Sequence, residues 1–197
     1  AAASYLRGVA LVQIPTTLLA QVDSAVGGKV GVNLPSGKNL AGAFHSPSLV
    51  VCDPDVLKSL RRREFRAGLY EVVKYGVVLS RDLFETVSAG LKPILRADSA
   101  TLAPLVARCC EIKAQVVSAD EREHGPRRVL NFGHTVGHAL EAMTDYRRFR
   151  HGEAVAYGML AAAQISRNRS LMSDEEHERL ADLVRRMGPL PPGTDLR

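Results

Sequence analysis

The sequence contains no tryptophan, few other aromatic residues and only three cysteines. Aromatic side chains make up 5% of the 197 residues, which argues against a nucleic-acid-binding module that stacks bases on aromatic rings. Cys52, Cys109 and Cys110 form no CxxC pair, and their odd number argues against a disulfide framework. We therefore expect a cytoplasmic protein in a reducing environment.

The sequence also lacks long apolar stretches. There is no run of about 18 apolar residues, so we expect no membrane span. The first residues lack the basic-then-apolar order of a secretory signal, and they begin without methionine, as a fragment of a longer protein would. The net charge is +5, but the basic residues are spread along the chain. A small anionic substrate explains this excess as well as a nucleic acid does.

The pattern of elements predicts an α/β plus all-α fold. Residues 9–14 and 48–53 are short apolar runs typical of buried strands, and a helix is expected over 16–22. The glycine-rich residues 23–33 and the polar residues 34–39 are expected to form loops. Apolar periodicity then predicts helices over about 54–60, 63–79, 81–89, 99–119, 133–145, 151–167 and 173–187, the last with a Ser173–Glu176 capping box. We place a domain boundary near residue 60, which gives domains over 1–60 and 61–197.

Three of the six histidines lie close together, at positions 134, 138 and 151. His134 and His138 are four residues apart, so on a helix they share one face. Imidazole nitrogens grouped in this way are typical ligands of a divalent metal such as zinc. The alternative is a helix that carries two partly buried histidines, and Asn131 could simply cap that helix.

Charged residues also occur where the helical pattern is apolar. Glu71 and Lys74 interrupt a helix that is apolar on both sides, and Lys113 lies beside the buried stripe of the helix over 99–119. Such charges are costly to bury unless they are paired or bind a ligand. A plain Glu71–Lys74 salt bridge and a Lys113 side chain that reaches solvent remain open alternatives. Glu71 with His134 and His151 would suit a catalytic zinc with open coordination positions.

Two glycine-containing segments could bind an anion. Gly27-Gly28-Lys29 and Ser36-Gly37-Lys38-Asn39 can each present backbone N–H groups and an ammonium group. Neither segment has the spacing of a nucleoside-triphosphatase P-loop, and the chain has no GxGxxG motif. Two tight turns with solvated lysines are the alternative.

Several motifs, taken together and in order, resemble the 3-dehydroquinate synthase family. They are Ile14–Ser24, Gly27–Lys29, Gly37–Asn39, Glu71–Gly76, Asp120–Glu123, Asn131–His138 and His151–Glu153. The family joins a Rossmann-like NAD-binding domain to a mainly helical metal-binding domain, so the resemblance implies a dehydroquinate synthase-like fold. It also implies that most of the nucleotide-binding domain precedes Ala1 and that the end of the helical domain follows Arg197.

The resemblance assigns roles to individual residues. It implies Zn²⁺, or Co²⁺, on Glu71, His134 and His151, and it makes His138 a contact to the substrate phosphate rather than a metal ligand. The implied NAD contacts are Thr16, Thr17, Asp23, Lys29, Lys38, Leu57, Lys58 and Ser59. The implied substrate contacts are Asn39, Lys74, Lys113, Arg127, Asn131, His138 and, reaching into the neighbouring subunit of a homodimer, Arg7. Ser59 stands where the family usually has threonine, and Tyr70 stands where it usually has a small residue.

The activity implied by the resemblance belongs to the shikimate pathway. 3-Deoxy-D-arabino-heptulosonate 7-phosphate would become 3-dehydroquinate and phosphate by NAD-mediated oxidation, phosphate elimination, reduction and intramolecular aldol closure. Lys113 and Arg127 would bind the substrate carboxylate. The alternatives are a sibling sugar-phosphate cyclase such as 2-deoxy-scyllo-inosose synthase, a metal-dependent polyol dehydrogenase with net NADH turnover, and a non-catalytic fragment that only binds a metal or a partner.

Overall fold

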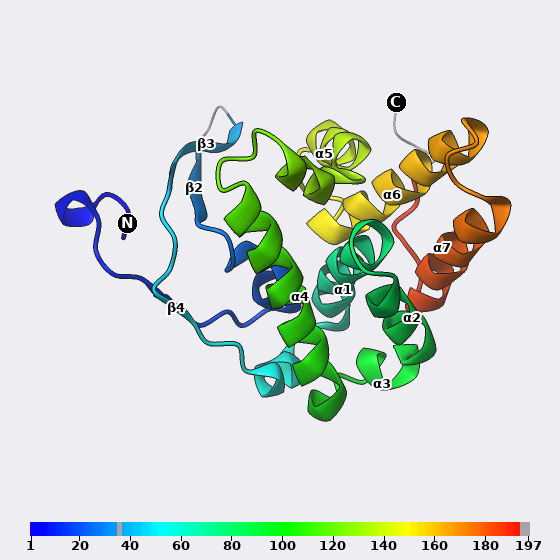
Figure 1. Ribbon diagram of the computed structural model, residues 1–197, viewed down its shortest axis with the longest axis horizontal. Helices are drawn as coiled ribbons and strands as arrows, with labels where there is room; N and C mark the ends of the chain where they lie inside the picture. The colour runs from blue at the N-terminus through cyan, green and yellow to red at the C-terminus, as the bar shows by residue number, and fades with distance from the viewer. Residues whose placement is uncertain (35–36, 194–197) are drawn as a thin grey trace.

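The computed structural model describes residues 1–34 and 37–193. Helix α1 (Arg62–Val78) lies among the other helices, and the two small sheets lie to one side of them with the N-terminus (Figure 1). The predicted fold class is confirmed, because a short α/β portion precedes a mainly helical portion. The domain boundary near residue 60 stays a prediction, although α1 begins close to it.

The α/β portion contains two two-stranded sheets. Strands β1 (Val12–Gln13) and β4 (Leu49–Val50) pair in parallel, whereas β2 (Lys29–Leu34) and β3 (Gly37–Phe44) form an antiparallel hairpin. The remaining elements of this portion are the 3₁₀ turns η1 (Tyr5–Arg7) and η3 (Pro54–Ser59) and the π-helical turn η2 (Ala20–Ser24). The predicted strands over 9–14 and 48–53 are therefore present but shorter.

The loop predicted over residues 23–33 is wrong from Lys29 onward, where β2 begins. Glycine content suggested a loop, but Val30, Val32 and Leu34 alternate with other residues as in a strand. Gly42 of β3 meets the backbone of β2 so closely that a Cβ atom there would overlap the carbonyl oxygen of Val30. The glycines thus serve strand pairing rather than a loop.

The helical portion follows the predicted order closely. It contains α1, α2 (Arg81–Ala89), α3 (Leu91–Leu95), α4 (Ser99–Ala119), the 3₁₀ turn η4 (Pro126–Asn131), α5 (His134–Met143), α6 (His151–Asn168) and α7 (Asp174–Met187). The capping box of α7 is confirmed, because Ser173 Oγ accepts from Glu176 N and Glu176 Oε2 accepts from Ser173 N. The short α3 and η4 were not predicted. None of the described helices has the length and apolarity needed to cross a membrane.

Helix α1 is buried on all sides, as its sequence predicted. Its apolar residues pack against α2, α6 and η2, and Leu69, Val72 and Val73 have no exposed surface. Glu71 and Lys74 are carried into the interior by the same helix, with 0% and 1% of their surface exposed. The core of the helical portion therefore surrounds a carboxylate and an ammonium group.

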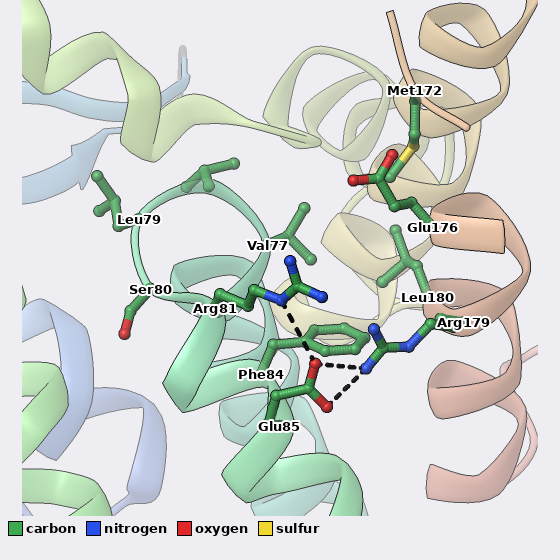
Figure 2. A pocket seen from close by; sticks show the side chains of 12 residues that line it. Val77, Leu79, Ser80, Arg81, Phe84, Glu85, Met172, Glu176, Arg179 and Leu180 are labelled. Carbon is green, nitrogen blue, oxygen red and sulfur yellow. Dashed lines mark hydrogen bonds and ion pairs between the residues drawn. The ribbon is translucent and has the colours of Figure 1, made fainter. Parts of the chain in front are cut away.

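One cavity lies between the end of α1, α2 and α7, with a volume of about 350 Å³ (Figure 2). Arg179 of α7 binds both oxygens of Glu85 at 2.6 Å, and its guanidinium carbon lies 5.4 Å from the centre of the Phe84 ring. None of the residues predicted for the functional site lines this cavity. Its charged residues attach α7 to α2, and the candidate site lies elsewhere.

Candidate functional site

Three candidate metal ligands converge from three helices. Glu71 comes from α1, His134 is the first residue of α5, and His151 is the first residue of α6. Their potential ligand atoms all lie within 4.8 Å of one another. The Nε2 atoms of His151 and His134 lie 3.3 and 3.8 Å from Glu71 Oε1. One carboxylate and two imidazoles therefore face a common point.

Close helix packing at glycine brings these residues together. A Cβ atom at Gly152, next to His151, would overlap the carbonyl oxygen of Ala67 in α1. A Cβ atom at Gly158 of α6 would overlap the carbonyl oxygen of Gly133, the residue before His134. Gly133 itself has a φ of +80°, which favours glycine. The absence of side chains at these positions lets α1, α5 and α6 approach one another.

The carboxylate of Glu71 is poorly satisfied without a cation. It forms an ion pair with Lys74, yet neither oxygen receives a hydrogen bond of normal geometry from the described residues. Burial alone would favour the neutral acid, but the charge of Lys74 and the two imidazoles hold the pKa of Glu71 below its ordinary value. An ionised, buried carboxylate that faces two imidazole nitrogens is a donor set that fits a divalent metal.

The outer nitrogens of both imidazoles are held in place. His134 Nδ1 lies 3.2 Å from the carbonyl oxygen of Phe132, and His151 Nδ1 lies 3.2 Å from Glu141 Oε2. Burial lowers the pKa of His134. Burial acts in the same direction on His151, but the hydrogen bond to Glu141 and the nearby negative charge of Glu71 raise its pKa to about 9. Both Nε2 atoms are left facing Glu71.

His138 lies beside this set but does not belong to it. It is exposed, and its ring centre lies 5.2 Å from that of His134 and 5.9 Å from that of His151. Its own potential metal partners are Glu141 and His151, again within 4.8 Å. The helical spacing that pairs His134 with His138 thus does not make the two histidines members of one ligand set.

Three cations lie together near the metal set. Lys113 Nζ donates to the carbonyl and Oδ1 oxygens of Asp23 at 2.5 Å, and Arg127 Nη2 donates to the carbonyl of Gly27 at 3.2 Å. A Cβ atom at Gly27 would lie 3.0 Å from Arg127 Nη2 and 3.5 Å from Lys113 Cε, so the two cations are neighbours. Partial burial and the charges of Arg127 and Lys113 lower the pKa of Lys29. We call Lys29, Lys113 and Arg127 the cation cluster.

Glu123 joins two residues predicted to contact substrate or cofactor. It pairs with Lys29, and it accepts a hydrogen bond from Asn131 Nδ2 at 2.6 Å. The idea that Asn131 caps α5 is therefore wrong, because the N-cap residue is Gly133 and no side chain caps that helix end. The idea that Lys113 reaches solvent is also wrong, because Lys113 is buried and bound to Asp23.

Tyr75 connects the cation cluster to α1. Its hydroxyl donates to Asp23 Oδ1 at 2.8 Å and lies 3.1 Å from the carbonyl oxygen of Val22. Asp23 is the partner of Lys113, and Tyr75 follows Lys74 in the chain. The buried phenol thus holds the Asp23–Lys113 pair next to the Glu71–Lys74 pair.

Removing this phenol hydroxyl is expected to lower stability measurably. Tyr75→Phe should lower the free energy of unfolding by about 1–3 kcal/mol, because it leaves the partly buried Asp23 carboxylate and the buried Val22 carbonyl with one donor fewer. Tyr157→Phe is the matched control, since Tyr157 donates to the carbonyl of Pro191 at 2.8 Å, outside the site, and should cost about 0.5–1.5 kcal/mol. Urea unfolding measures both variants, and a larger loss in Tyr157→Phe would contradict the account.

Several predicted cofactor contacts belong to the α/β portion and make none of the contacts described above. Thr16 is exposed, and Thr17 Oγ1 accepts from Ala20 N at 3.2 Å. Lys58 pairs with Asp55, and Ser59 Oγ donates to the carbonyl of Val56 at 2.9 Å. Leu57, which is buried, and Lys58, which is exposed, also line a cavity of about 600 Å³ whose wall includes Arg62, Arg66 and Arg96.

Arg7 does not join the described residues of the assembled site, because it is exposed in the turn η1 near the N-terminus. The side chains of Lys38 and Asn39 lie outside the described part of the structure, so their predicted roles stay predictions. Conversely, sequence reasoning missed the roles of Glu123 and Glu141. The sequence did contain a signal for Glu141, which follows His138 by three residues and so shares its helix face. The structure shows that Glu141 is buried despite its charge.

Solved structures with the same fold define the class of protein. The chain superposes on 2-epi-5-epi-valiolone synthase from Streptomyces hygroscopicus subsp. jinggangensis, solved with NAD+ and Zn²⁺, with a TM-score of 0.90 and 29% identity, over 100% of this chain and 54% of that one. It superposes on 2-deoxy-scyllo-inosose synthase, solved with carbaglucose-6-phosphate, NAD+ and Co²⁺, with a TM-score of 0.89 and 34% identity, over 98% of this chain and 54% of that one. The fold is that of the sugar-phosphate cyclases.

The sequence comparison identifies the family within this class. Residues 1–67 match the family described as 3-dehydroquinate synthase N-terminal, and residues 68–192 match 3-dehydroquinate synthase C-terminal. Curated 3-dehydroquinate synthases from Symbiobacterium thermophilum and Nostoc punctiforme are 55% and 51% identical over 98% and 100% of this chain. The chain belongs to the 3-dehydroquinate synthase family. It spans about half, 55%, of the length of these two relatives.

Proposed function

We propose that this chain forms the metal- and substrate-binding part of a 3-dehydroquinate synthase. The observation that carries the proposal is the set Glu71, His134 and His151, with the cation cluster linked to the same helix α1 through Asp23 and Tyr75. The substrate, 3-deoxy-D-arabino-heptulosonate 7-phosphate, has hydroxyl groups for a metal and two anionic groups for the cations. The protein would be a carbon–oxygen lyase of the cytoplasm that releases phosphate and yields 3-dehydroquinate.

Glu71, His134 and His151 would hold a Zn²⁺ or Co²⁺ ion, the metals present in the two similar structures. Three protein ligands leave coordination positions open for substrate hydroxyl groups. A bound divalent cation makes such a hydroxyl more acidic. Lys74, which is paired with Glu71, would place an ammonium group beside the reacting end of the substrate.

The substrate's anionic groups would be divided between two groups of residues. Lys113 and Arg127 would bind the carboxylate, and Lys29, Asn39, Asn131 and His138 would bind the phosphate. In the structure the Glu123 carboxylate pairs with Lys29 and accepts a hydrogen bond from Asn131. A bound phosphate would take the place of Glu123 at both residues, and the released Glu123 carboxylate would then be available to accept a proton. In a homodimer, Arg7 would reach the phosphate bound by the neighbouring subunit.

NAD would bind beside this set, at Thr16, Thr17, Asp23, Lys29, Lys38, Leu57, Lys58 and Ser59. The cofactor supplies reversible hydride transfer and is not consumed. The cavity next to Leu57 and Lys58 supports a dinucleotide, because three arginines on its wall suit a diphosphate group. Asp23, through its bond to Lys113, lies where cofactor and substrate sites would meet.

Phosphate release tests the proposed substrate. A protein of the family's full length that contains this chain should release phosphate from 3-deoxy-D-arabino-heptulosonate 7-phosphate with NAD and Zn²⁺, without net NADH. Arg127→Ala should raise KM for this substrate about 10- to 100-fold, because a charge-assisted carboxylate contact is lost. Arg185→Ala, an exposed arginine of α7, is the control and should leave KM unchanged.

Two outcomes would overturn the proposal. Preferred turnover of a hexose 6-phosphate that lacks a carboxylate would indicate a sibling cyclase such as 2-deoxy-scyllo-inosose synthase. Net NADH formation with a simple polyol would indicate a metal-dependent dehydrogenase.

A further inference from the structure

We infer that Glu141 is a positioning residue that holds the imidazole of His151 in the orientation needed to bind the metal. The inference rests on the proposed metal site and adds a residue outside its ligand set. Glu141 is on α5, two helical turns after His134, and its side chain is 4% exposed. Its Oε2 atom lies 3.2 Å from His151 Nδ1 on the neighbouring helix α6.

The chemistry of imidazole explains why this contact matters. A neutral imidazole carries its proton on one of its two nitrogens, and only the other nitrogen has a lone pair for a metal. A carboxylate that accepts a hydrogen bond from Nδ1 keeps the proton there and turns Nε2 toward the metal. In this structure the Nε2 atom of His151 lies 3.3 Å from Glu71 Oε1, on the metal side.

The two histidines of the set are held by different means. His134 Nδ1 faces the backbone carbonyl of Phe132, which no side-chain substitution removes. His151 Nδ1 faces the side chain of Glu141. A change at Glu141 therefore releases one ligand and leaves the other in place.

Glu141 could instead be a metal ligand itself, since it forms a second set with His138 and His151. Two observations favour the positioning role. The third member of that set, His138, is exposed, whereas Glu71 and His134, the other candidate partners of His151, are buried and half-buried. Glu71 is fully buried with both oxygens lacking normal hydrogen bonds, so it has the greater need for a cation.

Metal titration of graded variants tests the inference. In the 197-residue chain, Glu141→Ala should weaken Zn²⁺ binding about 10- to 100-fold with one ion still bound, as measured by competition with a chelating indicator. Glu141→Gln should lie between wild type and Glu141→Ala, because the amide oxygen still accepts a hydrogen bond from Nδ1. Glu111→Ala removes an exposed glutamate of α4 and should bind like wild type.

The visible absorption of the Co²⁺-loaded chain gives a readout of ligand geometry. The bands should shift in Glu141→Ala, shift less in Glu141→Gln and stay unchanged in Glu111→Ala. A Glu141→Ala chain with wild-type affinity and spectrum would overturn the inference and leave the proposed metal site standing. Complete metal loss in Glu141→Ala, with metal retained in Glu71→Gln, would make Glu141 a ligand and overturn both the positioning role and the proposed ligand set. A wild-type chain that binds no Zn²⁺ would also overturn the positioning role and the proposed metal site.

Discussion

Glu71→Gln is expected to reduce Zn²⁺ affinity by more than about 1,000-fold, close to complete loss. The substitution keeps the shape of the side chain but removes the anionic oxygen that a divalent cation requires. Carboxylate and amide differ little in volume, so packing around α1 should be retained. Isothermal titration of the metal-free chain with Zn²⁺ measures the effect.

The same substitution leaves Lys74 without its charged partner, which gives a second test. Lys74 is 1% exposed and pairs with Glu71, and breaking a buried pair from one side costs about 3–5 kcal/mol. The double variant Glu71→Gln with Lys74→Met removes both charges and should recover much of this stability. The double variant should not recover metal binding. Recovery of both stability and Zn²⁺ affinity would contradict a ligand role for Glu71.

The histidines provide matched comparisons. His151→Ala should lose metal as Glu71→Gln does, because it removes another member of the set. His138→Ala should retain the metal and, in the full-length protein, slow phosphate release. Equal metal loss in all three variants would contradict the division between ligands and substrate contact.

Gly152→Ala is expected to destabilise the chain by about 3 kcal/mol, the upper end of the usual cost of overpacking, and to abolish the metal site. The new Cβ atom would overlap the carbonyl oxygen and carbon of Ala67, which are backbone atoms of a buried helix and cannot rotate away. Helix α6 would have to move from α1, and overpacking of this kind costs about 1–3 kcal/mol or more. Because His151 is adjacent, the same movement takes it away from Glu71.

Gly193→Ala is the control for this substitution, since a Cβ atom there meets no atom within 4 Å. Urea unfolding and Zn²⁺ titration of the two variants should differ sharply, with Gly193→Ala close to wild type. A Gly152→Ala chain with unchanged stability and metal affinity would contradict the proposed role of close helix packing.

The sequence predicts the helical portion well because its signals are local. Helix α4 begins and ends where periodicity placed it, and α7 has the predicted capping box. The short helix α3 escapes prediction because Pro93 interrupts its pattern. The hairpin of β2 and β3 escapes because its glycines resemble a loop until the close strand contact at Gly42 is known.

The candidate site is only partly predictable for a different reason. Unusual charge on the apolar helix α1 directs attention to Glu71, and histidine clustering directs it to His134 and His151. Helical spacing alone would join His134 to His138, and the choice between His138 and Glu71 depends on how α1 meets α5 and α6. The pairings of Asp23 with Lys113 and of Glu141 with His151 join residues on separate elements, so sequence position does not reveal them.

A crystal structure of the Zn²⁺-loaded chain, with anomalous scattering at the zinc edge, tests the central claim most directly. The account predicts a single ion bound by Glu71 and by the Nε2 atoms of His134 and His151, with His138 outside its coordination shell. An ion bound by His138, Glu141 and His151, or anomalous signal only at surface sites, would contradict it.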